Sequence, residues 1–161
     1  MDKIKFLVMD VDGTLTDGKI YMGLKGEMCK AFDIKDGCGI HDIAVPNGMR
    51  PVIITGRSST IVLNRCEELG IDEIYQGVRD KVKQLKNVTK DLSTVAYIGD
   101  DINDLLCMKL VKNAGGIIGC PMDAVKEVKA VADFISDKKG GNGAVRDFIE
   151  WLCERKDIRD V

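Results

Sequence analysis

The sequence predicts a doubly wound, Rossmann-like α/β fold, in which a mostly parallel sheet carries helices on both faces. Short continuous apolar runs recur along the chain, and amphipathic helical patterns separate them. Strands that alternate with helices imply right-handed crossovers and a ligand site beyond the carboxyl ends of the strands. The length of 161 residues fits one domain, residues 1–161, with an ordinary core.

The individual elements follow from the same patterns. Apolar runs predict strands at 6–9, 52–54, 95–98 and 117–118. Ser58 and Ser59 are candidate caps for the first long helix, and Gly70 is its candidate stop. Helical spacing predicts four apolar faces, namely Val62, Cys66 and Leu69; Val78, Val82 and Leu85; Ile102, Leu105, Leu106 and Leu110; and Val145, Phe148, Ile149 and Leu152.

Three other segments depart from the regular alternation. Alternating apolar residues on either side of Lys25-Gly26 predict a β-hairpin at about 19–33, directly after the first strand. Pro46 interrupts the pattern of residues 37–48, which predicts a short helix that ends or kinks near Ala44. The C-terminal tail, about 138–161, begins with a glycine-rich loop before the last helix.

The composition excludes several classes of function. The 24 basic and 26 acidic residues give a formal net charge of -2, so we expect neither a nucleic-acid partner nor a membrane partner. His41 is the only histidine, which excludes Ser-His-Asp and Cys-His triads and multi-histidine metal sites. Hydrolytic chemistry would therefore depend on carboxylates.

The cysteine and targeting patterns favour the cytoplasm. The six cysteines include no Cys-X-X-Cys pair, which favours a reducing compartment and free thiols over a zinc site. The first apolar run is too short for a signal peptide, and no stretch approaches the roughly 20 apolar residues of a membrane span. We therefore expect a soluble, unprocessed cytoplasmic protein.

Three polar clusters each follow directly on a predicted strand. They are DVDGT at 10–14, TGR at 55–57 and GDDIND at 99–104. A single Asp-rich turn is more often a helix cap or an Asx-turn than a site. Parallel strands, however, would bring all three clusters to one edge of the sheet, and this convergence predicts a functional site there.

The carboxylates of these clusters are suited to phosphate chemistry. Asp10, Asp100 and Asp104 could provide hard oxygen ligands for Mg²⁺, which would offset the repulsion between a carboxylate and a phosphate dianion. Asp10 could then attack phosphorus and form an aspartyl-phosphate. Asp12 could give a proton to the leaving oxygen and later take one from the attacking water.

A hydroxyl group and an ammonium group could assist the carboxylates in binding the phosphate. The hydroxyl of Thr55 could bind a phosphoryl oxygen, and a lysine ammonium could balance the charge of Asp10 and the phosphate. Lys81 is our candidate, but sequence spacing does not choose between Lys81, Lys83 and Lys86, and a lysine in the first turn of a helix is ordinarily solvated.

The order and spacing of these motifs resemble the haloacid dehalogenase superfamily of phosphatases. Longer stretches are similar to its 3-deoxy-D-manno-octulosonate 8-phosphate phosphatase branch nearly end to end, including KAFDIKDGCGI at 30–40, NRCEELGI at 64–71, YQGVRDK at 75–81 and GGNGAVR at 140–146. Thr14 stands where this branch often has valine, and the Pro46-Asn47 pair falls where the branch is expected to have an uninterrupted helix.

The resemblance implies a role for each acidic residue. Asp10 would be the nucleophile, and Asp12 would be the acid/base group and also a Mg²⁺ ligand through its backbone carbonyl. Asp100 would bind the metal directly, and Asp104 would act through water. The expected cofactor is therefore Mg²⁺.

The resemblance also implies which residues bind the substrate. Thr55 and Lys81 would bind the phosphate, while Arg57, with Gly56 beside it, would face the rest of the substrate. Arginine suits a carboxylate or a hydroxyl-rich acid. Arg65 is a second candidate for binding the substrate. The alternative, which we weigh equally, is that Arg65 is an ordinary exposed arginine on a helix.

The spacing leaves no room for a cap domain, because only about twenty residues separate Thr14 from Asp36. An open site would need another cover against water, most simply a neighbouring subunit. The resemblance implies a homotetramer in which the hairpins associate and the segment from Gly140 to Arg146 approaches a neighbour's site, with Arg146 as a substrate-binding candidate. Alternatively, these glycines merely form a turn into the last helix.

Several functions remain open at this stage. The first is Mg²⁺-dependent hydrolysis of a phosphorylated keto-sugar acid, most simply the octulosonate 8-phosphate of lipopolysaccharide biosynthesis. Nine-carbon 9-phosphates of the nononate or sialic acid type are the alternative substrates. A phospho-acceptor signalling module would have its motifs in a different order, and a non-catalytic tetramerisation module of a cytidylyltransferase system would not need the complete acidic set.

Overall fold

The structure is a computed structural model that describes residues 4–157. Residues 1–3 and 158–161, and with them the two ends of the expected domain and C-terminal tail, lie outside the described residues. The centre is a six-stranded sheet in the order β5-β4-β1-β6-β7-β8, and every neighbouring pair is parallel. The strands are β1 (Phe6–Met9), β4 (Arg50–Ile54), β5 (Glu73–Tyr75), β6 (Val95–Ile98), β7 (Ile117–Cys120) and β8 (Phe134–Ile135).

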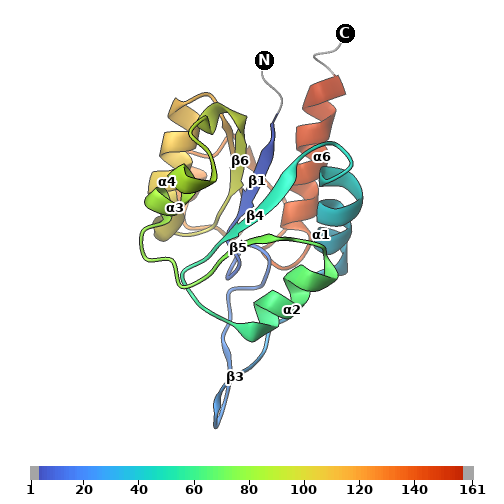
Figure 1. The fold of residues 1–161 in the computed structure, drawn as a ribbon, viewed down its shortest axis with the longest axis vertical. Coiled ribbons are helices and arrows are strands. Elements are labelled where there is room, and N and C mark those ends of the chain that lie inside the picture. Colours follow the sequence, from blue (N-terminus) through green and yellow to red (C-terminus); the bar gives the residue numbers. More distant parts are fainter. Residues whose placement is uncertain (1–3, 158–161) are drawn as a thin grey trace.

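Helices cover both faces of this sheet, as Figure 1 shows. One face packs against the π-helix η1 (Gly39–Ala44), α2 (Thr60–Glu68) and α6 (Ala144–Asp157), and α1 (Ile34–Cys38) packs against η1 and α6. The other packs against α3 (Lys81–Val88), α4 (Ile102–Asn113) and α5 (Lys126–Lys129), while the 3₁₀ turn η2 (Leu92–Thr94) leads into β6. The predicted doubly wound fold without a cap domain is confirmed. Within residues 4–157, no helix is both long and apolar enough to cross a membrane.

The chain reverses its direction across the sheet at β1. It moves from β1 outwards to β4 and β5, then returns to the other side of β1 for β6, β7 and β8. In open α/β sheets, a crevice forms where the connections diverge in this way, beyond the carboxyl ends of the strands. The fold therefore places a candidate site at the end of β1.

The buried face of α4 differs from the prediction. Ile102 and Leu106 were expected to line the apolar face, yet they are 65% and 61% exposed. The buried face of α4 contains Cys107, Met108 and Val111 instead. The completely buried Asp104, one turn earlier, lies on the same face. The predicted face was wrong because the apolar pattern assigns a charged residue such as Asp104 to the exposed side of a helix.

Several short elements were missed or misplaced. β5, β8 and α5 contain three, two and four residues, too few for periodicity to reveal. The helix predicted from Val78 begins at Lys81, because the Asp80 side chain caps it by accepting a hydrogen bond from the Lys83 amide. The helix expected at 37–48 begins earlier, with α1, but η1 ends at Ala44 as predicted.

The predicted hairpin is present and forms a sheet of its own. Its strands, β2 (Tyr21–Gly23) and β3 (Gly26–Cys29), pair antiparallel and extend away from the main body (Figure 1). The side chains of Met22, Leu24 and Met28 are largely exposed. An isolated two-stranded hairpin is marginally stable in water, so this element depends on contacts at its base.

A buried aspartate joins α1 to the start of α6. Asp36 is 1% exposed, and its carboxylate accepts hydrogen bonds from the amides of Gly143 (3.4 Å) and Arg146 (2.9 Å). Burial raises the pKa of Asp36 to about 6; the backbone donors oppose this rise, and the nearby Asp33 charge adds to it. Asp36 thus caps the last helix, but its burial makes the folded protein less stable when the carboxyl group is ionised.

We predict that Asp36→Asn changes how stability depends on pH. Since the pKa of Asp36 in the folded protein lies above the ordinary value of 3.8, its stabilising contribution is complete below that value and is lost as the pH rises through about 6. From about pH 4 to about pH 7, wild type should lose up to about 3 kcal/mol of unfolding free energy relative to the variant. Urea unfolding at several pH values measures this difference, with Asp72→Asn, an exposed site, as the control. Parallel profiles for wild type and Asp36→Asn would contradict it.

Candidate active site

The sheet brings the three predicted clusters together. β1 lies between β4 and β6, and Met9, its last residue, is in register with Ile53 and Ile98 on the two neighbours. Asp10, Thr55 and Gly99 therefore leave the same edge of the sheet. The convergence predicted from the sequence is confirmed.

Three carboxylates form the centre of the site. One oxygen from each of Asp10, Asp100 and Asp104 lies within 4.8 Å of the others. Gly13 permits this proximity, because it has a φ of +91° and a Cβ there would lie 2.0 Å from Asp100 Oδ2. Thr14 donates a hydrogen bond to Asp100 Oδ1 at 3.2 Å. The threonine that departs from the resembled branch therefore contacts the acidic cluster directly.

Lys81 lies among these carboxylates. Its ammonium donates to Asp10 Oδ1 at 2.8 Å and to Asp104 Oδ1 at 2.9 Å, and the residue is 5% exposed. Lys83 and Lys86 are exposed. The structure thus resolves the choice that spacing left open, and it does so by starting α3 at Lys81.

Asp104 is held by donors on all sides. Besides Lys81, the Tyr97 hydroxyl donates to its Oδ1 at 2.8 Å, and the amides of Asp100 and Asp101 donate to its Oδ2 at 3.2 and 3.5 Å. Both oxygens are therefore engaged in fixing the lysine and the turn after β6. Asp10 and Asp100 have the less engaged oxygens of the cluster.

The electrostatics of the cluster favour an added cation. Burial, followed by the charge of Asp104, raises the pKa of Asp10 above its usual range, although Lys81 lowers it. Burial and the charges of Asp10 and Asp104 likewise raise the pKa of Asp100. Three hard oxygen donors with one ammonium between them carry excess negative charge, which fits a divalent ion such as Mg²⁺.

Asp12 lies beside this cluster at the edge of the site. Its side chain is 21% exposed, and Oδ1 accepts a hydrogen bond from Lys30 at 2.5 Å. Glu27, on β3, lies 3.0 Å from the same ammonium and 3.6 Å from Arg57 Nη2. The base of the hairpin therefore contacts two of the predicted site residues.

The residues after β4 line the other side of the site. Thr55 is buried, its amide donates to Tyr75 O, and its carbonyl accepts from the Val78 amide. Gly56 is exposed, and a Cβ there would meet nothing closer than 3.8 Å. Arg57 has a side chain 47% exposed, as a residue that faces a substrate would require.

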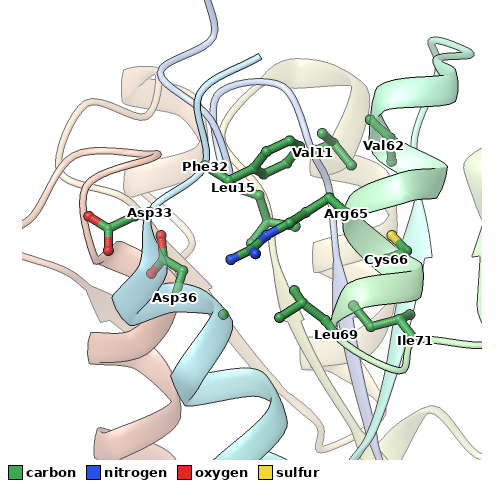
Figure 2. Close-up of a pocket in the computed structure, with 11 residues that line it drawn as sticks. Val11, Leu15, Phe32, Asp33, Asp36, Val62, Arg65, Cys66, Leu69 and Ile71 are labelled. Atoms are coloured by element: carbon green, nitrogen blue, oxygen red, sulfur yellow. The ribbon is translucent and has the colours of Figure 1, made fainter. Parts of the chain in front are cut away.

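The two other predicted arginines lie outside the acidic cluster. Arg65 extends from α2 toward Asp36 on α1, in a narrow crevice that Val11 and Leu15 also line (Figure 2). It pairs with Glu68 at 3.1 Å, and its buried Nε has no hydrogen-bond partner in the part of the chain that the structure describes. Arg146, in the first turn of α6, pairs with Glu150 at 2.6 Å. Within residues 4–157, neither arginine contacts the three carboxylates.

Three further residues of the site, Tyr97, Glu27 and Lys30, were not predicted from the sequence. Tyr97 sits in the apolar run of β6, where a buried hydroxyl needs a partner, and this requirement was a usable signal. Glu27 and Lys30 gave no signal beyond their place in the hairpin, because their contacts with Ser59 and Asp12 join segments distant in sequence.

The glycine-rich loop packs against the loop after β1 of its own chain. The Gly141 amide donates to Thr14 O at 3.1 Å, and a Cβ on Gly140 would lie 1.9 Å from Gly13 O. The glycines thus do form a turn into α6, and the contact additionally supports the loop after β1.

Comparison with known proteins adds relatives of stated activity. No protein-family model matches the chain. The chain is 39% identical over 155 residues to the 3-deoxy-D-manno-octulosonate 8-phosphate phosphatase KdsC of Escherichia coli, covering 94% of this chain and 80% of that protein. It is also similar to the crystal structure of the Moraxella catarrhalis phosphatase of the same activity, in complex with magnesium ion, phosphate ion and KDO, with a TM-score of 0.86 and 41% identity over 94% of this chain and 86% of that one. A HAD superfamily (subfamily III A) hydrolase structure from Legionella pneumophila has a TM-score of 0.87 and 33% identity, covering 96% and 84% of the two chains.

We predict that Mg²⁺ stabilises the folded protein through Asp100. A ligand that binds only the folded state raises the melting temperature as its concentration exceeds the Kd. Wild type should show a saturable rise in Tm with Mg²⁺, and Asp100→Asn should need at least about tenfold more Mg²⁺ for the same rise, because it lacks one anionic ligand.

Thermal-shift measurements provide the test without any assay of activity. Asp101→Asn is the matched control, since Asp101 is the exposed neighbour that caps α4 and asparagine can also cap. An identical Mg²⁺ response in wild type and Asp100→Asn would contradict the assignment.

Proposed function

Because this chain belongs to the family of 3-deoxy-D-manno-octulosonate 8-phosphate phosphatases, within the HAD superfamily, we propose that it hydrolyses a phosphorylated keto-sugar acid. The octulosonate 8-phosphate is the first candidate, which would place the enzyme in lipopolysaccharide biosynthesis. The observation that carries the proposal is the contact of Lys81 with both Asp10 and Asp104 at the end of β1, next to Asp100. Enzymes that transfer phosphoryl groups act mostly by positioning the reactants and by stabilising their negative charge, which such a set of charged groups can do.

The reaction would proceed through a phosphorylated aspartate. Asp10 attacks phosphorus with its less engaged oxygen, the bond to the sugar oxygen breaks, and Asp12 gives that oxygen its proton. Water then attacks the aspartyl-phosphate and passes a proton to Asp12. Inorganic phosphate leaves, and both carboxyl groups return to their starting states.

The remaining residues would bind the phosphate. Mg²⁺, held by Asp10, Asp100 and the backbone carbonyl of Asp12, would neutralise the charge that carboxylate and phosphate share. Asp104 would act through water, which agrees with the hydrogen bonds that already engage both of its oxygens. Lys81 and the Thr55 hydroxyl would bind phosphoryl oxygens.

Arg57 is the residue that we propose selects a keto acid. Its guanidinium is the exposed basic group beside the site, and a guanidinium binds a carboxylate with two parallel hydrogen bonds. Gly56 would allow the substrate to approach the backbone. We assign Arg65 and Arg146 secondary roles in binding the sugar portion, Arg146 through a neighbouring subunit.

The complete acidic set supports catalysis over a purely structural role in a cytidylyltransferase system. We also propose that residues 1–161 form one catalytic domain. The six cysteines are all free thiols, as expected of a protein that works in the reducing cytoplasm.

We predict that the enzyme prefers the eight-carbon substrate. With Mg²⁺ present, kcat/KM should be highest for 3-deoxy-D-manno-octulosonate 8-phosphate, lower for nine-carbon 9-phosphates and lowest for hexose phosphates. Asp10→Asn should lower phosphate release by at least about a thousandfold, because an amide is a poor nucleophile. Asp42→Asn, at an exposed site, is the control.

Two results would overturn parts of this proposal. A higher kcat/KM for a nine-carbon phosphate would replace the substrate, and substantial turnover by Asp10→Asn would remove the nucleophile. Absence of phosphate release from every ester by wild type would favour the structural role instead.

We further propose a homotetramer whose subunits cover one another's sites. The hairpin presents Met22, Leu24 and Met28 to solvent, and these apolar side chains would be covered in such an assembly. The site has no cap domain, and phosphoryl transfer benefits from the exclusion of bulk water. Association through the hairpins would satisfy both needs.

We predict that Leu24→Asp weakens this assembly. Wild type should sediment as a species of four chains, and the variant should dissociate at concentrations at least about tenfold higher, because an unpaired charge would enter the apolar contact. Val45→Asp, an exposed apolar site outside the hairpin, is the control. A wild-type monomer with full activity would rule out the tetramer proposal.

A further inference from the structure

Lys30 is buried at the base of the hairpin. It follows β3 directly, and its side chain is only 1% exposed, although lysine is seldom buried unless it is paired. Its ammonium lies 2.5 Å from Asp12 Oδ1 and 3.0 Å from Glu27 Oε2. An ammonium that is removed from water needs close anionic partners, so these contacts differ from an ordinary surface ion pair.

Glu27 connects the same group to the opposite side of the site. Its Oε1 accepts a hydrogen bond from the Ser59 hydroxyl at 2.7 Å, and its Oε2 lies between Lys30 and Arg57. The loop after β1 and the loop after β4 are thus joined through two side chains from the hairpin. Among the contacts of residues 4–157, neither side chain has a hydrogen bond or ion pair with the three clustered carboxylates.

Asp12 depends on this connection for its orientation. Within residues 4–157, Lys30 donates the one side-chain hydrogen bond that the Asp12 carboxylate receives. The bond engages Oδ1 and leaves Oδ2 without a side-chain donor among residues 4–157. A general acid must lie within about 2.6–3.2 Å of the atom it protonates, and a displacement of about 1 Å can cost roughly a hundredfold in rate.

We propose that Lys30 is a positioning residue for Asp12 and that Glu27 fixes Lys30, so that the base of the hairpin orients the acid/base group. This inference rests on the proposed phosphatase function. In the acid form the proton resides on Oδ2, the oxygen that Lys30 leaves free, and it passes to the leaving sugar oxygen as the P–O bond breaks. The hairpin then has a role inside its own subunit.

The test compares two leaving groups in a single turnover. An alkoxide such as that of the sugar acid needs a proton as it leaves, whereas p-nitrophenolate does not. Lys30→Met should slow sugar release from the octulosonate phosphate by about 10–100-fold. It should slow p-nitrophenol release from p-nitrophenyl phosphate by less than about threefold. A separate steady-state assay should show little change in KM for either ester.

Two further variants complete the design. Glu27→Gln should also slow sugar release more than p-nitrophenol release, but to a smaller degree than Lys30→Met. This variant still tests the proposal if Lys30→Met does not fold. Lys25→Met, the same substitution at an exposed lysine of the hairpin turn, should match wild type on both esters.

The outcomes separate this inference from the proposed function. Equal losses on the two esters would indicate a merely structural role and overturn it, as would an unchanged rate of sugar release. A wild type that hydrolyses p-nitrophenyl phosphate and another alkyl phosphate but not the octulosonate ester would overturn the substrate alone, and the comparison would then use that alkyl ester. A wild type that hydrolyses no ester would overturn both.

Discussion

The repulsion between three neighbouring carboxylates is the constraint on which the rest of the structure depends. Asp10, Asp100 and Asp104 have oxygens within 4.8 Å of one another at the end of the central strands. Such an arrangement requires positive charge among the oxygens or protonation of a carboxylate. Lys81 provides one charge, and the excess that remains is the physical reason for a divalent ion. The absence of a side chain at Gly13 and the Tyr97 hydroxyl then serve to keep the acidic groups close.

The strand ends were predictable because apolar runs and the polar residues that follow them are both local features of the sequence. Parallel pairing then required Asp10, Thr55 and Asp100 to meet. The α4 face was not predictable from apolar periodicity, because Asp104 occupies an inward position that the pattern counts as outward. Its burial depends on donors from β6 and α3, which only the assembled fold supplies.

The same distinction applies to the side chains of the site. Sequence spacing could not choose Lys81 over its neighbours, since the choice depends on where Asp80 starts the helix. Lys30 and Asp12 are 18 residues apart, and no local pattern relates them. Arg65 and Arg146, assigned by resemblance, have ion-pair partners on their own helices, which spacing could have suggested.

The close contact between the two glycine loops constrains protein engineering. Gly140 lies where a Cβ would meet Gly13 O, and the Gly141 amide donates to Thr14 O, so the tail and the loop after β1 fit each other without any side chain between them. A chimaera that exchanged only the C-terminal tail with that of a more distant enzyme would disturb the backbone beside Asp10. These two loops would therefore have to be exchanged together, although they lie far apart in the sequence.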